Sequence, residues 1–199
     1  MKTDIITVSA KGKKIETALE QVEKVAAYKG LSPKNTLHLR LLTEEMMGLM
    51  RSITGEPEGE FWIEDHDGEF ELHLRVASRM NLEKREQLLS VSASGKNEAA
   101  RGLMGRIRAF FDWGCDEEYD GLTMAMMPDA FEHSSSPMLD WEWSMRRYEN
   151  AVSAKMGEDE AAREAWDELE KSVVKNVADD VRVFIRGGYV ELTILKKMD

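Results

Sequence analysis

Apolar and polar residues alternate over residues 60–76, and this period of two predicts a β-hairpin. In the second arm every other residue is apolar, namely Phe70, Leu72, Leu74 and Val76. Asp67 and Gly68 separate the two arms, and both residue types tolerate the positive φ of a tight hairpin turn. A second hairpin is predicted at residues 181–195, where a Gly-Gly pair separates two strand-like segments.

A period near 3.6 replaces this alternation over residues 15–53 and predicts two amphipathic helices after a short strand at residues 4–10. The stripe of the first helix is Ile15, Leu19, Val22 and Ala26. That helix ends near Gly30, and Ser32 and Pro33 supply the cap and the first residue of the next. The stripe of the second helix is Leu39, Leu42, Met46, Leu49 and Ile53.

Further along the chain we expect a short helix at residues 82–89, a loop at 90–98, a helix at 99–113 and a strand at 122–127. Two helices follow, with the stripes Trp141, Met145, Tyr148 and Val152, then Ala162, Trp166, Leu169, Val173 and Val177. We expect these stripes to pack onto the domain or onto a second subunit. The mixture predicts an α+β fold, a two-layer sandwich of helices on one face of a mixed, mostly antiparallel sheet.

Charge and composition narrow the classes of partner. The 199 residues include 27 basic and 38 acidic side chains, for a formal net charge of −11. Phosphate binding needs concentrated positive charge, so we expect neither nucleic acid nor an anionic membrane surface as the main partner. The sequence has no signal-peptide pattern and no apolar run long enough to span a membrane, and Cys115 is its one cysteine. We therefore expect a cytoplasmic protein.

Most familiar catalytic and metal-binding motifs are missing from the sequence. His38, His66, His73 and His133 are scattered without metal-ligand spacing, so we expect ordinary surface histidines and no metal site. The chain contains no P-loop, no G-x-G-x-x-G and no G-x-S-x-G. We interpret Cys115 as a bystander thiol.

Glu44 and Gly48 form the more informative pattern. They stand four residues apart within the second predicted helix and therefore share one face. A glycine inside a helix costs about 1 kcal/mol relative to alanine, and a glutamate beside a small residue can act as a general base. Downstream, residues 92–105 place serines, glycines and Lys96 before a helix, whose N-terminus attracts anions.

The order of these elements resembles the histidine-kinase-like ATPase superfamily (GHKL fold), and most closely the anti-sigma-factor serine kinases. Members begin with a strand and two helices, the second of which carries an E-x-x-x-N motif. A hairpin, a D-x-G-x-G box, a lid over the nucleotide, a glycine-containing helix start and a final strand follow. The resemblance covers about residues 1–112 and 179–197, and implies one ATPase-like domain over 1–199 with a helical insertion at about 113–178.

The resemblance also implies roles for individual residues. Glu44 falls on the glutamate that activates the attacking group, Gly48 on the asparagine that holds Mg²⁺, and Ser52 on a downstream histidine. The nucleotide-binding residues implied by the lid and the following helix are Gly95, Lys96, Arg101, Gly102 and Gly105. Residues 74–81, where an adenine-reading aspartate would stand, contain neither aspartate nor glycine. ATP and Mg²⁺ are the implied cofactors, and the missing asparagine and aspartate weaken the site for both.

Three interpretations remain open. In the first, the protein is a regulatory protein with a degenerate nucleotide site that binds a regulatory protein partner or a ligand, and the resemblance makes a homodimer plausible. In the second, it is an active serine protein kinase or ATPase with Glu44 as the base and Lys96 or Arg101 on phosphate. In the third, it is an unrelated α+β protein in which Glu44 and Glu45 are surface acids and Gly48 allows close helix packing.

Overall fold

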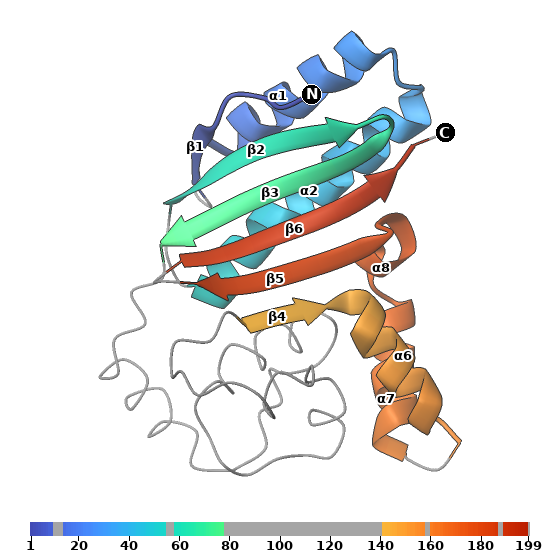
Figure 1. Cartoon of the computed structure of the whole chain (residues 1–199). Helices are drawn as coiled ribbons and strands as arrows, with labels where there is room; N and C mark the ends of the chain where they lie inside the picture. Colours follow the sequence, from blue (N-terminus) through green and yellow to red (C-terminus); the bar gives the residue numbers. More distant parts are fainter. Residues whose placement is uncertain (10–13, 55–57, 78–140, 158–159, 187–188, 199) are drawn as a thin grey trace.

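The computed structural model describes the chain except for residues 10–13, 55–57, 78–140, 158–159, 187–188 and 199. The strands are β1 (Ile6–Ser9), β2 (Glu58–His66), β3 (Glu69–Ala77), β4 (Trp141–Ser144), β5 (Asp180–Arg186) and β6 (Tyr189–Lys197). The helices are α1 (Lys14–Lys29), α2 (Pro33–Thr54), α6 (Met145–Lys155), α7 (Glu160–Glu170) and α8 (Val173–Val177). The predicted α+β class is confirmed (Figure 1).

The strands form one six-stranded sheet in the order β1-β2-β3-β6-β5-β4. Every pairing among them is antiparallel. Strand β1 therefore lies beside the β2–β3 hairpin. Strand β6 pairs with both β3 and β5, so it joins that hairpin to the β5–β6 hairpin. Strand β6 contacts β3 through a register that pairs Leu72 with Ile194 and Leu74 with Leu192, so the two ends of the chain share one sheet.

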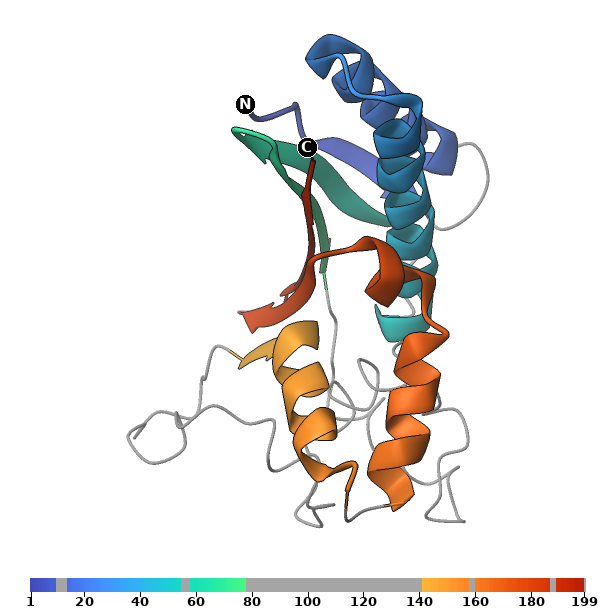
Figure 2. The ribbon, with the colours of Figure 1, turned by 90° about the vertical axis from the view of Figure 1, so that its right-hand side faces the viewer.

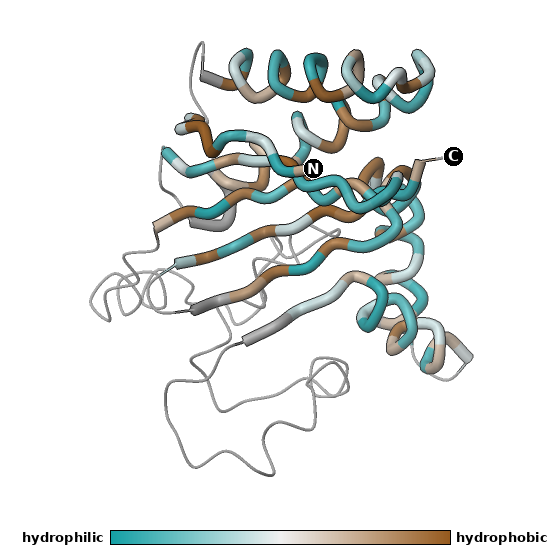
Figure 3. Tube along the Cα trace, turned by 45° about the horizontal axis from the view of Figure 1, so that its top comes forward, coloured by the Kyte–Doolittle hydropathy of each residue, from teal (hydrophilic) through white to brown (hydrophobic). Residues whose placement is uncertain are grey.

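The helices cover one face of this sheet, and Figure 2 shows α1 and α2 as a layer beside it. The buried face of the sheet includes Phe61, Ile63, Leu72, Leu192 and Ile194. Leu39, Leu42, Met46 and Met50 of α2 belong to the same apolar cluster. Figure 3 shows the resulting alternation of hydrophobic and hydrophilic positions along the strands. Alternation of this kind leaves the opposite face with the polar half of each strand.

Local signals account for the elements that the sequence predicts correctly. Asp67 (φ 53°) and Gly68 (φ 92°) form the β2–β3 turn, as the alternation on either side requires. The Ser32 side chain accepts a hydrogen bond from the Asn35 N–H (3.2 Å) at the start of α2. Gly30 (φ 66°) ends α1, and the N–H groups of Gly30 and Leu31 donate to the carbonyls of Ala27 and Ala26, which is a Schellman cap.

Two predictions between residues 141 and 177 are wrong. Trp141–Ser144 is the edge strand β4, paired with β5, and the helix begins only at Met145 because the Ser144 side chain caps it. The second predicted helix is two helices, since Ser172 begins α8 by accepting from the Lys175 N–H. Both segments still pack on the domain as expected: Tyr148, Val152, Leu169 and Val174 belong to the core cluster.

The elements predicted at residues 82–89, 90–98, 99–113 and 122–127 lie outside the described residues. Among the helices that the structure describes, none has the length and apolar character needed to cross a membrane.

Candidate functional site

The Glu44–Gly48 pair lies on the outer side of α2. The Glu44 side chain is 48% exposed, and its carboxylate lies 4.0 Å from an Arg40 guanidinium nitrogen one turn earlier. Gly48 is also exposed, whereas the neighbouring Met46 and Met47 are fully buried. The buried methionines thus pack α2 on the sheet, and the face of the helix that carries Glu44 and Gly48 points outward.

A side chain at Gly48 would meet open space. A Cβ built there has no described atom within 4 Å, so among the described residues the glycine is not needed for close helix packing. This finding removes the packing explanation within the described part of the chain. Among the described residues, no packing contact therefore compensates for the roughly 1 kcal/mol that a glycine inside a helix costs.

The remaining predicted site residues are placed only in part. Ser52 lies in the last turns of α2, two helical steps of four after Glu44, so the backbone puts it on the same side of the helix. Gly95, Lys96, Arg101, Gly102 and Gly105 lie outside the described residues. The described residues therefore include only the α2 part of the predicted site.

A groove of about 500 Å³ opens between the N-terminal segment and α1. Its lining includes Met1, Ile6, Gln21, Lys24 and Tyr28. It does not include Glu44 or Gly48, so it is separate from the site that the sequence predicts.

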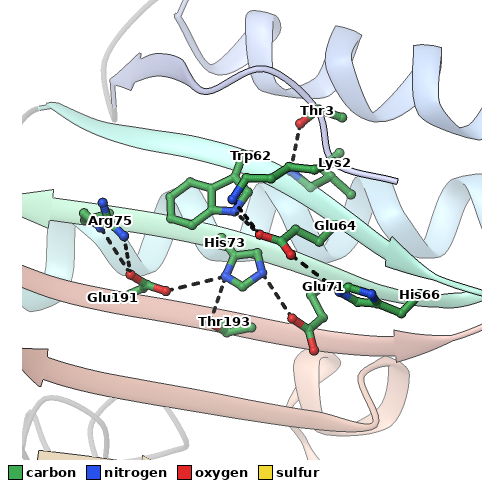
Figure 4. A network of polar contacts seen from close by, with 11 residues as sticks. Lys2, Thr3, Trp62, Glu64, His66, Glu71, His73, Arg75, Glu191 and Thr193 are labelled. Atoms are coloured by element: carbon green, nitrogen blue, oxygen red, sulfur yellow. Dashed lines mark hydrogen bonds and ion pairs between the residues drawn. The ribbon is translucent and has the colours of Figure 1, made fainter.

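The face of the sheet opposite the helices carries a polar network that the sequence does not predict (Figure 4). Trp62 of β2 stacks on His73 of β3, with ring centroids 4.8 Å apart and an angle of 2° between the planes. The Lys2 ammonium and the Arg75 guanidinium lie 5.3 and 5.1 Å from the centroid of the Trp62 ring, close enough for cation–π attraction. The Trp62 ring covers His73, which is only 8% exposed, so the prediction that His73 is a surface histidine is wrong.

Carboxylates surround the His73 ring. Its Nδ1 lies 3.2 Å from the Thr193 hydroxyl and 3.6 Å from Glu191 Oε1, and Arg75 holds Glu191 through its Nε and Nη2 groups. On the other side of the ring, Nε2 lies 3.2 Å from Glu71 Oε2. The hydrogen bond from His73, followed by those from Arg75, keeps the pKa of Glu191 below its usual value despite partial burial.

Glu64 and His66 of β2 lie next to this group. The Lys2 ammonium (2.9 Å) and the Trp62 indole N–H (3.0 Å) both contact Glu64 Oε1, and the pKa of Glu64 falls to about 2 chiefly because of the Lys2 contact. Glu64 Oε2 lies 3.4 Å from His66 Nε2. Ligand atoms of Glu64, His66 and Glu71 all lie within 4.8 Å of one another, so this part of the sheet gathers one imidazole and two carboxylates, with the His73 ring next to Glu71.

The strand register explains how these residues meet. Trp62 pairs with His73 and Glu64 with Glu71 across the hairpin, and residues two apart on a strand share a face. Applied to the alternation of residues 60–76, this rule would have placed Glu64, His66, Glu71 and His73 together. These residues do not stand at the helical or loop spacing of familiar metal sites, because their side chains meet across neighbouring strands.

Comparison with known proteins gives no family assignment: no protein-family model matches the sequence, and no curated protein is significantly similar to it.

Proposed function

We propose that the protein is a cytoplasmic regulatory protein with a histidine-kinase-like ATPase fold. In this proposal its layout is that of the anti-sigma-factor serine kinases, its nucleotide site is degenerate, and it acts by binding a regulatory protein partner or a ligand. The observation that carries the proposal is the position of α2, which packs against β3 and β6 beside the β2–β3 hairpin. The resemblance requires this helix to pack on the sheet beside that hairpin.

The element order supports the same proposal. A strand, two helices and a hairpin come first, and the chain closes with a hairpin whose last strand pairs with β3. This is the order that the resemblance implies for residues 1–77 and 179–197. The extra strand β4 and helices α6 to α8 fall within the segment that the resemblance treats as an insertion.

Gly48 supports the degenerate form of the site. Mg²⁺ needs oxygen ligands, and the glycine that stands at the asparagine position offers no side-chain oxygen. Glu44 keeps its carboxylate, but a base without a positioned metal and adenine contact loses most of the binding energy that catalysis requires. The protein therefore binds Mg-ATP weakly or not at all.

Thermal unfolding in the presence of nucleotide tests the proposal. A ligand at a concentration equal to its Kd raises stability by about 0.4 kcal/mol, which shifts the Tm of a chain of this size by about 1–2 °C. We expect a smaller shift with 1 mM Mg-ATP or Mg-ADP. A larger shift that Glu44→Ala abolishes would refute the degenerate site, and ATP hydrolysis lost in Glu44→Gln would establish the active kinase or ATPase instead.

A gain-of-binding variant sharpens this test. Gly48→Asn restores the E-x-x-x-N pattern, and Gly48→Ala is its matched control because both replace the helix glycine but only asparagine adds an oxygen. On the proposed fold, Gly48→Asn strengthens Mg-ATP binding relative to Gly48→Ala. Equal responses of the two variants would count against the resemblance itself.

The proposal extends to the assembly that the resemblance implies. Light scattering checks for a homodimer, and a monomer at all accessible concentrations would exclude a constitutive dimer.

A further inference from the structure

The two strands of the first hairpin carry one Glu-x-His pair each. Glu64 and His66 stand on β2, and Glu71 and His73 stand on β3. Because residues two apart project to one face and Glu64 pairs directly with Glu71, all four side chains lie on the face opposite the helices. Figure 4 shows them converging beside the Trp62–His73 stack.

The direct Glu64–Glu71 pairing is unfavourable without a cation. Like charges opposite one another on neighbouring strands destabilise a sheet. Lys2 offsets part of this charge, but it contacts Glu64 Oε1 and leaves Glu64 Oε2 beside His66. The oxygens that face the two imidazoles therefore remain available to a further positive charge.

The His73 ring gives independent evidence for such a charge. The side chain is nine-tenths buried, and its Nε2 makes no hydrogen bond to any described residue although Glu71 Oε2 lies 3.2 Å away. A proton on Nδ1, which faces the Thr193 hydroxyl and the Glu191 carboxylate, leaves the Nε2 lone pair directed at the Glu71 oxygen. Two lone pairs facing each other at this distance repel, and a positive charge beside them, either a proton or a metal ion, relieves the repulsion.

The distances suit a metal ion. Two ligand atoms about 2.1 Å from a tetrahedral ion lie about 3.4 Å apart. The Nε2–Oε2 distances of 3.2 Å for His73 and Glu71 and 3.4 Å for His66 and Glu64 both match this value. A histidine held on its far nitrogen by a carboxylate, as His73 is by Glu191, is the usual support of a metal ligand.

We propose that Glu64, His66 and Glu71, whose ligand atoms lie within 4.8 Å of one another, bind one divalent transition-metal ion of the zinc class, and that His73, whose Nε2 lies 3.2 Å from Glu71 Oε2, joins them as the fourth ligand when the ion binds. Two imidazoles with two carboxylates suit Zn²⁺ and its neighbours, whereas Mg²⁺ and Ca²⁺ prefer oxygen alone. The site lies on the opposite face of the sheet from Glu44 and does not depend on the proposed function. The ion would cross-link the two strands of the hairpin close to its turn.

Titration of the metal-free full-length chain with Co²⁺ and Zn²⁺ tests this site. We expect one Co²⁺ per chain, with the visible absorption of a site of low coordination number, displacement by Zn²⁺ and a higher Tm in the presence of either ion. Mg²⁺ at the same concentration produces none of these effects.

Two ligand variants and one control locate the ion. Loss of an outer-shell partner typically weakens metal binding 10–100-fold, so loss of a ligand in His66→Gln or Glu71→Gln should weaken Co²⁺ binding at least about tenfold. His66 is 61% exposed, so its variant keeps the fold. The control Glu69→Gln lies on the same face of β3, two residue pairs nearer the turn and opposite His66, but outside the group of ligand atoms, so it should bind Co²⁺ as the wild type does.

The proposal is overturned if the wild-type chain shows no stoichiometric Co²⁺ spectrum at about 100 micromolar metal, a concentration well above the Kd of structural zinc sites. It is equally overturned if His66→Gln and Glu71→Gln bind Co²⁺ as tightly as the control, since the ion would then be held elsewhere in the chain.

Discussion

Replacing Gly48 by alanine should stabilise the protein. Gly48 lies inside the 22-residue helix α2, and a Cβ at this position meets no described atom within 4 Å. The gain is therefore the full helix-propensity difference of about 1 kcal/mol, part of which comes from the reduced freedom of the unfolded chain. For a chain of this size that free energy raises the Tm by about 2–4 °C.

Two other glycines provide matched comparisons. Gly30 also has open space around a Cβ, but its φ is +66°, so Gly30→Ala should lose about 1–2 kcal/mol through backbone strain alone. At Gly59 a Cβ would lie 3.0 Å from both the Arg75 carbonyl oxygen and the Met50 sulfur. Gly59→Ala should therefore destabilise the protein by overpacking, typically by 1–3 kcal/mol.

Urea unfolding followed by circular dichroism measures all three variants. The order of unfolding midpoints should be Gly48→Ala above wild type, with Gly30→Ala and Gly59→Ala below it, at an unchanged m value. A lower midpoint for Gly48→Ala would refute the reasoning. It would mean that an atom outside the described residues, or a partner, occupies the space beside Gly48.

Other contacts make further predictions. Buried Asp180 accepts hydrogen bonds from the Ser144 hydroxyl (3.2 Å) and from a backbone N–H at the start of α6, so Asp180→Ala should cost about 1–3 kcal/mol in thermal unfolding. Ser144→Ala removes the N-cap of α6 and should cost about 1 kcal/mol. Burial raises the pKa of Asp65, but the contact with Lys29 outweighs burial, so the pKa of Asp65 lies below its usual value. Ionised Asp65 therefore stabilises the fold above about pH 4, and this contribution is lost as the pH falls. Lys29→Met should therefore destabilise the protein at pH 7 and destabilise it less near pH 3. Lys24→Met removes an equal charge from an exposed position of α1 and should not show this dependence on pH.

The pattern of residues determined the elements whose signals are local. Asp67 and Gly68 specify their turn because few residues accept a positive φ, and Ser32, Pro33 and Gly30 mark helix ends through hydrogen bonds within a few residues. The stripe from Leu39 to Met46 specifies which side of α2 is buried, since a helix must cover its apolar face. For the same reason Glu44 and Gly48 were correctly placed together on one face of that helix.

Only the tertiary structure decided what depends on pairing between distant segments. Trp141 lies in a strand because β5 supplies hydrogen-bond partners about forty residues later, and local periodicity carries no information about such a partner. His73 is buried because Trp62 stacks on it from β2 and Thr193 and Glu191 approach from β6. Burial and register are properties of the assembled sheet, so the Glu-x-His pairs can be read in the sequence but their common site exists only where β2, β3 and β6 lie side by side.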